Sequence, residues 1–552
     1  MRKIIFSFSL LCIYYIAASQ AIKQGASSNQ TGIQRPKLVV GIVVDQMRWD
    51  FLYRYYDRYS EEGGFKQMLH QGFSCENTFI PYIPTITACG HTSIYTGSVP
   101  AIDGITGNDW WDYSLSQMTY CTEDNTMKTV GSTTDAGQMS PQNLLVTTIG
   151  DELRLATNFH SKVIGIAIKD RAAILPAGHS ANGAYWYDEK TGDWITSSYY
   201  MNDLPKWMKD LNSKKLTDQY FAKDWNTLYP LDTYIQSTAD DVPYENKPFG
   251  ASTKGFPYNL NQFVGKNYGL LPVTPYGNTV TFDVAEAAIQ GEQLGSGNYT
   301  DLLTISLSTP DYIGHSFGPN SVEAEDVYLR LDKDLGEFIG FLDKQVGKGN
   351  YLVFLSADHG VDQVPAFLKE HKIPAGSVAS SSISDQLNNY LKTKFNKDKL
   401  VIAIMNYQVY LDRSLINESH LDKNEVYKAA VDFLMVQPGI EKAIPLDALS
   451  EATLNNDIKN AMANGDYPPR SGDIQLVYLP QWIDEFPKRG TTHGVWNPYD
   501  SHIPLLWFGW NIQPGKTNRQ VYMTDIAPTI AAMLHIQMPS GSVGHVIGET
   551  VK

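Results

Sequence analysis

The sequence predicts an α/β fold, a doubly wound and mostly parallel sheet with helices on both faces. Strand-like runs alternate with segments of helical length along the chain. The runs lack polar alternation, as expected for strands buried on both faces of a parallel sheet. Polar residues suited to chemistry follow several of these runs, where the carboxyl ends of parallel strands form a ligand crevice.

The predicted strands are short runs rich in Val, Ile and Leu. The first covers residues 37–44 and is ended by Asp45, and similar runs cover 162–168, 302–308, 351–356 and 503–508. Lys169, Asp311 and Asp358 also stand at or shortly after the ends of runs. We therefore expect these side chains to converge at one edge of the sheet.

Segments of helical length separate the runs. In 322–346, apolar residues recur at helical spacing and charges fill the other face. Further helices are predicted at 142–156 and 526–534.

A chain of 552 residues exceeds the size at which one hydrophobic core keeps growing. We predict a catalytic domain over 36–552 that carries two insertions. The first, 180–278, is rich in Trp, Tyr, Asn and Pro and is expected beside the site; the second is 363–489.

The net charge of −15 offers no positive field to a nucleic acid duplex, so duplex binding is not expected. Residues 1–21 have the charged, apolar and small-residue parts of a secretory signal peptide, which predicts an exported, periplasmic or secreted protein. The apolar part is shorter than the ~20 residues of a spanning helix. An uncleaved anchor is therefore less favoured, and no transmembrane segment is expected after cleavage.

The residues that could carry chemistry are one hydroxyl nucleophile and two sets of metal ligands. Thr87 lies in the segment 84–93, and Asp311 and His315 stand one helical turn apart, so that both can reach one ion. Asp358 and His359 are adjacent at a turn. Asp45 and His493 complete the set. Each pair is a weak signal alone, and their joint occurrence is informative. His91 is expected to pack beneath the nucleophile segment rather than to bind metal.

These residues, in this order, resemble the alkaline phosphatase superfamily over most of the chain, from Lys37 to about Leu534. The resemblance implies two zinc ions beside a threonine nucleophile. One would be held by Asp311, His315 and His493. The other would be held by Asp45, Asp358, His359 and the Thr87 oxygen.

Two further motifs resemble the phosphate-irrepressible alkaline phosphatases of Bacteroidota, whose nucleophile is threonine. Residues 104–110 contain Asn108, and residues 167–171 end in the pair Lys169 and Arg171. By this resemblance Asn108, Lys169 and Arg171 would hold the nonbridging phosphoryl oxygens.

The resemblance implies a metal-dependent hydrolase that acts on small-molecule phosphate monoesters, an alkaline phosphatase, through a phosphothreonine at Thr87. A threonine hydroxyl has no useful alkoxide population near neutral pH, so metal coordination must activate it. Two zinc ions, three aspartates, Lys169, Arg171 and a threonine alkoxide sum to a charge of about +2, which suits a monoester dianion.

Four alternatives remain, of which a cofactor-independent mutase is less favoured because export would remove it from glycolytic substrates. A phosphodiesterase or nucleotide pyrophosphatase on the same scaffold would share the threonine and metals but lack the Lys169 and Arg171 pair. A sulfatase is disfavoured because no Cys-x-Pro-x-Arg context surrounds Thr87. An exported, non-catalytic binding protein that uses the aromatic stretch is less favoured, since no proposed ligand is missing.

Overall fold

The computed structural model describes residues 33–485 and 488–551. The predicted signal peptide, residues 1–21, lies outside the described residues. The described residues from Pro36 onward form one compact unit. Within the described part of the chain, no helix combines the length and the apolar character needed to cross a membrane.

A ten-stranded sheet forms the centre of this unit. In spatial order its strands are β20 (Gly515–Thr517), β2 (Phe73–Cys75), β19 (Leu505–Gly509), β11 (Tyr351–Ser356), β1 (Leu38–Val44), β10 (Asp301–Leu307), β7 (Val163–Ala167), β8 (Gly183–Asp188), β9 (Asp193–Ser197) and β6 (Thr129–Val130). The pairs β11–β1, β1–β10, β10–β7, β7–β8 and β2–β20 are parallel. The pairs β11–β19, β19–β2, β8–β9 and β9–β6 are antiparallel. The predicted mostly parallel sheet is confirmed.

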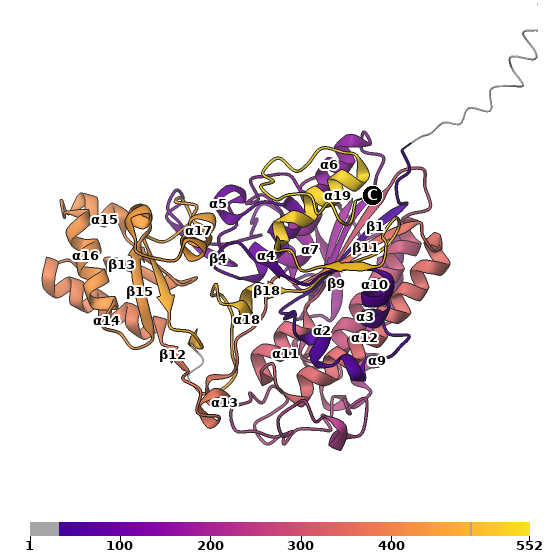
Figure 1. Ribbon diagram of the computed structural model, residues 1–552, viewed down its shortest axis with the longest axis horizontal. Coiled ribbons are helices and arrows are strands. Elements are labelled where there is room, and N and C mark those ends of the chain that lie inside the picture. The colour runs from indigo at the N-terminus through magenta and orange to yellow at the C-terminus, as the bar shows by residue number, and fades with distance from the viewer. Residues whose placement is uncertain (1–32, 486–487, 552) are drawn as a thin grey trace, which may run out of the picture. The chain divides into compact units, whose positions relative to one another are not determined.

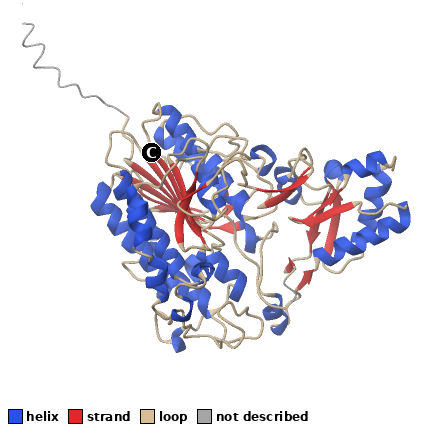
Figure 2. Cartoon of the chain, turned by 180° about the vertical axis from the view of Figure 1, so that it is seen from behind, coloured by secondary structure: helices blue, strands red, loops and turns tan. Residues whose placement is uncertain are grey.

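Helices cover both faces of this sheet (Figures 1 and 2). One group is α4 (Thr87–Thr96), α6 (Ile149–Ala156), α7 (Asp170–Ala177) and α19 (Ile526–Leu534). The other is α3 (Gly64–Gln71), α10 (Tyr276–Glu292) and α12 (Val322–Leu342). All seven residues of β1 and of β10 are buried between these layers. Burial on both faces therefore explains why polar and apolar residues do not alternate in these strands, as predicted.

One predicted helix begins later than the sequence indicated. The segment 142–156 is helical only as α6, from Ile149, and residues 142–148 are not part of a helix. Thr148 ends the preceding loop because its side chain accepts a hydrogen bond from the Asp151 amide, while Asp151 accepts one from the Thr148 amide. This reciprocal capping fixes the start of the helix.

The stretch predicted as a second insertion, 363–489, contains a separate four-stranded sheet. Its strands lie in the order β13 (Val401–Met405), β14 (Gln408–Leu411), β16 (Ile474–Tyr478) and β15 (Ile440–Pro445). The helices α14 (Ser380–Phe395) and α16 (Lys423–Leu434) pack on this sheet around a core of their own.

The stretch 180–278 instead adds β8 and β9 to the main sheet. Several of its aromatic side chains are buried rather than presented to a ligand: Tyr185, Trp186, Tyr187, Trp194 and Trp225. The two insertion boundaries remain predictions.

Candidate active site

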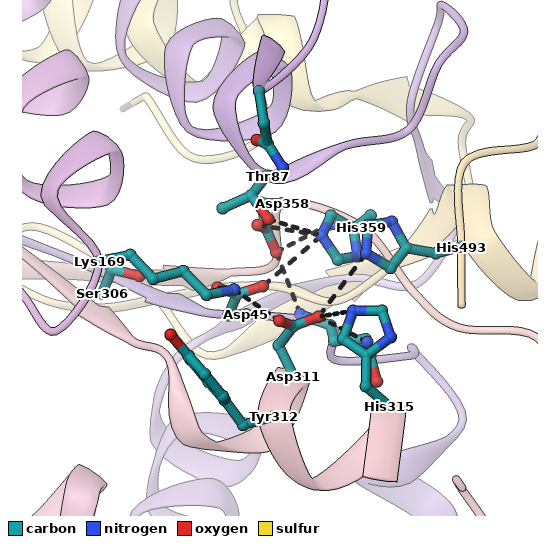
Figure 3. A network of polar contacts seen from close by, with 12 residues as sticks. Asp45, Thr87, Lys169, Ser306, Asp311, Tyr312, His315, Asp358, His359 and His493 are labelled. Carbon is teal, nitrogen blue, oxygen red and sulfur yellow. Dashed lines mark hydrogen bonds and ion pairs between the residues drawn. The ribbon is translucent and has the colours of Figure 1, made fainter. Parts of the chain in front are cut away.

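The predicted site residues meet at the carboxyl ends of the central parallel strands. Asp45 directly follows β1, Asp358 follows β11, and Lys169 follows β7. Asp311 lies in the first turn of α11 (Thr309–Phe317), which begins two residues after β10. The neighbouring positions of these strands bring the side chains together, as in ligand crevices of other α/β sheets. Figure 3 shows this convergence.

Asp311, His315 and His493 form the first group of potential metal ligands. One ligand atom from each lies within 4.8 Å of the others. Asp311 Oδ1 is 3.0 Å from His315 Nε2 and 3.7 Å from His493 Nε2. The helical spacing predicted for Asp311 and His315 is present, since both lie on α11.

Asp45, Asp358 and His359 form the second group. His359 Nε2 is 3.5 Å from Asp45 Oδ1 and 3.3 Å from Asp358 Oδ2, and all three side chains are fully buried. The Thr87 hydroxyl lies 3.4 Å from the same His359 nitrogen. The sequence-predicted nucleophile therefore stands at the edge of this second group.

All three imidazoles have the same orientation. Nδ1 lies 2.7–2.9 Å from a main-chain carbonyl oxygen: His315 on Thr491, His359 on Gly360 and His493 on Thr85. A carbonyl oxygen can only accept, so each Nδ1 carries the proton and each Nε2 presents a lone pair. The Nε2 atoms point into the site (Figure 3). This carbonyl-anchored tautomer is the usual second shell of a metal-binding histidine.

The site contains more negative charge than its own side chains neutralise. Asp45, Asp311 and Asp358 converge on it, and Lys169 is the cation between them. Asp45 Oδ1 and Asp358 Oδ2 are buried and make no hydrogen bond with any described residue. Burial and the charge of Asp358 raise the pKa of Asp45 well above its usual value. A buried, unsatisfied carboxylate is costly, and divalent cations would remove this cost. The donor set of three carboxylates and three Nε2 atoms suits zinc.

Lys169 lies between the two ligand groups. Its Nζ is 2.6 Å from Asp45 Oδ2 and 2.6 Å from Asp311 Oδ2, and its side chain is 3% exposed. Burial lowers the pKa of Lys169, but the two carboxylates outweigh burial and raise it above its usual value. The ammonium is therefore charged and lies where it could meet both the metal ligands and a bound phosphoryl group.

Thr87 is the first residue of α4, directly after Ile86. Helix N-termini favour anions because their amide groups and dipole face the ligand. Asn108 lies beside this helix start, since its Oδ1 accepts a hydrogen bond of 3.1 Å from the Ala88 amide. Its side-chain amide nitrogen donates to no acceptor in the described part of the chain and can donate in the same neighbourhood. Gly90 allows α4 to approach the second ligand group, because a Cβ there would lie 2.3 Å from the Asp358 carbonyl oxygen.

Arg171 lies in the first turn of α7, two residues after Lys169. Its Nη1 donates to the Tyr120 hydroxyl at 3.1 Å, and Tyr120 in turn donates to Asp170 at 2.8 Å. Arg171 Nε is buried without a hydrogen-bond partner in the described part of the chain. This guanidinium thus keeps donor capacity for an anion.

Three further residues support the site, and two of them, Gln46 and Ser306, were not singled out from the sequence. Gln46 adopts a positive φ of 68°, and its side-chain amide lies 2.5 Å from Asp311 Oδ1 while its backbone amide donates to Asp358. His91 packs beneath the nucleophile, as expected, and also lies 3.2 Å from Asp358 Oδ2. Its Nε2 accepts a hydrogen bond of 2.8 Å from Ser306. The position of Gln46 directly after Asp45 is the sequence feature that could have indicated its role in the site.

Comparison with known proteins agrees with this geometry. The profile of the family described as type I phosphodiesterase / nucleotide pyrophosphatase matches residues 39–500. The chain belongs to this family, within the alkaline phosphatase superfamily. The predicted superfamily is thereby confirmed.

Several members of the superfamily are similar to the chain over nearly its whole length. "Alkaline phosphatase PhoV" of Synechococcus elongatus is 51% identical over 98% of both chains. "Alkaline phosphatase PafA" of Elizabethkingia meningoseptica is 50% identical over 94% of this chain and 95% of its own. A Myroides odoratus relative named "Calcium-transporting ATPase" is 52% identical over 94% of this chain and 95% of its own. Two of these three relatives are named alkaline phosphatases.

A solved structure extends the similarity to three dimensions. The crystal structure of wild-type alkaline phosphatase PafA has a TM-score of 0.93 and 50% sequence identity. It covers 95% of this chain and 100% of the PafA chain. The similarity therefore includes the stretches 180–278 and 363–489 as well as the central sheet.

Proposed function

We propose that the chain hydrolyses small-molecule phosphate monoesters as an alkaline phosphatase, with two zinc ions and a phosphothreonine intermediate at Thr87. The observation that carries the proposal is the pair of three-residue ligand groups, one of which adjoins the Thr87 hydroxyl. Near-full-length identity of about 50% to enzymes named alkaline phosphatases supports the same reaction.

In this proposal Asp311, His315 and His493 hold one ion. The other ion is held by Asp45, Asp358, His359 and the Thr87 oxygen. When bound, the zinc ions lower the pKa of the threonine hydroxyl and stabilise the attacking and leaving oxygens of an in-line displacement.

Thr87 Oγ1 would attack phosphorus, and the bond between phosphorus and the leaving alcohol oxygen would break. Water would then hydrolyse the phosphothreonine, which releases inorganic phosphate and restores the hydroxyl. The N-terminus of α4 favours the negative charge of the phosphoryl group throughout both steps. His91 holds the Thr87 carbonyl through a contact of 3.0 Å and thereby fixes this end of the helix.

We assign Asn108, Lys169 and Arg171 to the nonbridging phosphoryl oxygens. Preorganised donors aimed at such oxygens stabilise the transition state. The assignment is supported by a PafA variant in which a threonine, an asparagine, a lysine and an arginine are replaced together. These are the same residue types, in the same order, as Thr87, Asn108, Lys169 and Arg171.

Monoesters should be preferred to diesters. A phosphate monoester dianion carries one more charged oxygen than a diester, and Lys169 with Arg171 supplies two cations to meet it. A second organic group on a diester would stand where these donors lie. The phosphodiesterase alternative, which shares the metals and the threonine, has no residue in this set that favours it.

A side-by-side assay of an aryl phosphate and the matching methyl aryl diester tests the proposal on zinc-loaded protein. We expect higher kcat/KM for the monoester, and a larger loss for the monoester than for the diester in Arg171→Ala and Lys169→Ala. Equal losses on both substrates would contradict the assigned roles, and a preference for the diester would overturn the substrate class.

We further propose that the protein is exported and acts in the periplasm or outside the cell, on the basis of residues 1–21. Its net charge of −15 is unsuited to duplex nucleic acid. Free phosphate esters of small molecules are accordingly the proposed substrates.

A further inference from the structure

Two buried glutamates outside the active site lack the partners that buried carboxylates normally have. Glu245 is 1% exposed, and neither of its carboxylate oxygens has a hydrogen-bond partner among the described residues. Glu323 is fully buried; its Oε1 accepts a hydrogen bond from the Tyr258 hydroxyl, and its Oε2 is also without a partner. Three unpartnered carboxylate oxygens in the protein interior need either a bound cation or a proton to compensate for their burial.

Backbone contacts hold the segment that carries Glu245 against the start of α12, where Glu323 lies. The Thr238 amide donates to the Asn320 carbonyl at 2.8 Å, and the Asn246 amide donates to the Ser316 carbonyl at 2.8 Å. Glu323 is the second residue of α12. After burial, the charge of Glu323 is the largest influence that raises the pKa of Glu245, to about 9. The two carboxylates therefore act on each other.

The nearby basic side chain Lys247 is paired with another carboxylate and forms no ion pair with Glu245 or Glu323 in the described part of the chain. Lys247 is bound to Asp241, with Nζ 2.6 Å from Oδ1. Asp240 adds a further negative charge, and it accepts hydrogen bonds from the Phe256 amide. The surroundings thus offer carboxyl oxygen ligands in excess of basic side chains.

We propose that Glu245 and Glu323 bind a structural divalent cation of the calcium class, separate from the two catalytic metal groups. Hard cations such as Ca²⁺ take carboxylate oxygens and complete their coordination with carbonyls and water. The unpartnered oxygens supply up to three such ligands. The competing arrangement is a single proton shared between the two carboxyl groups, which would satisfy the pair without metal.

The cation would stabilise the loop that carries an active-site ligand. The Tyr244 carbonyl, next to Glu245, accepts a hydrogen bond of 3.0 Å from the Gly490 amide. The following residue, Thr491, donates its amide to the His315 carbonyl and accepts from His315 Nδ1. The site is thus connected to His315 through one short loop.

Terbium luminescence on zinc-loaded protein tests this proposal, because Tb³⁺ substitutes for Ca²⁺ and is excited through nearby aromatic rings. Tyr258 donates to Glu323, and its ring centroid lies 5.2 Å from that of Trp225. We expect sensitised Tb³⁺ emission that Ca²⁺ displaces. It should fall at least about tenfold in Glu245→Gln and Glu323→Gln. Glu337→Gln, which removes an exposed carboxylate from the same helix α12, should leave the emission unchanged.

Calcium should also raise the Tm of the zinc-loaded wild-type protein by about 2 °C at a concentration about a hundred times its dissociation constant. The two active-site zinc ions should remain in both Gln variants, so that failure here leaves the proposed hydrolase unaffected. Emission and Tm that do not differ between wild type and the Gln variants would overturn the proposal in favour of the shared proton.

Discussion

The substitution Lys169→Met tests how much this lysine stabilises the folded protein without metal and, separately, with zinc bound. Without metal, the Lys169 ammonium is 2.6 Å from both Asp45 and Asp311 and is almost fully buried. Removal of one partner from a buried ion pair costs about 3–5 kcal/mol. For a unit of about 520 residues, the entropy of unfolding near 60 °C is about 1.1 kcal/mol/K. We therefore expect the Tm of the metal-free variant to fall by about 3–5 °C.

With zinc bound, the ions supply the positive charge that the carboxylates need. The Tm of zinc-loaded Lys169→Met should then lie within about 1 °C of the zinc-loaded wild type. The apparent zinc affinity should be unchanged or higher, because the ammonium no longer competes for Asp45 and Asp311.

Differential scanning calorimetry of both forms, with a zinc titration, measures these quantities. Lys428→Met is the matched control, because Lys428 Nζ lies 2.7 Å from Asp432 Oδ2 but both side chains are largely exposed. Water and salt screen an exposed pair strongly, so the control should shift Tm by about 1 °C or less. An equal fall of Tm in metal-free and zinc-loaded Lys169→Met, or weaker zinc binding, would refute the reasoning.

Three further predictions concern the same site. Thr87→Ala should reduce kcat by about 10⁴-fold or more while metal analysis still finds both zinc ions; retained turnover would exclude Thr87 as the nucleophile. Gly90→Ala should destabilise the fold by about 1–3 kcal/mol in denaturant unfolding because its Cβ would meet the Asp358 backbone, and a neutral change would contradict that close approach. Burial lowers the pKa of His315, but Asp311 outweighs it and raises the pKa above 6.5, whereas burial lowers that of His359. Zinc needs neutral imidazoles and ionised carboxylates, so falling pH should release zinc from both groups, through protonation of His315 in one and of Asp45, whose pKa is also raised, in the other; full zinc retention after dialysis at acidic pH would contradict this.

The sequence predicted five of the ten strands of the central sheet and the approximate positions of most site residues. The runs at 37–44, 162–168, 302–308, 351–356 and 503–508 correspond to β1, β7, β10, β11 and β19 within a few residues. Burial on both faces removes polar alternation, and this signal is local in sequence. Asp45, Asp358 and Lys169 could be assigned to one edge because each follows such a run.

Other features depend on contacts between distant segments and leave no local signal. The antiparallel direction of β19 beside β11 follows from a pairing of residues about 150 positions apart. The contacts of Gln46 with Asp311 and Asp358 span more than 250 positions. The salt bridges of Lys169 with both ligand groups arise in the same way. The late start of α6 did have a local sequence signal, the capping residue Thr148. A prediction from apolar periodicity alone does not use capping residues and therefore placed the helix start too early.

The main-chain carbonyls that hold the three imidazoles belong to loops that are far apart in the sequence, at Thr85, Gly360 and Thr491. Their meeting therefore requires a finished tertiary structure. Metal capture would follow folding, in contrast to zinc fingers, whose polypeptide remains unfolded until the ion arrives. A cell short of zinc could then accumulate a folded but idle reserve of this protein, ready to become active as soon as the ion is supplied.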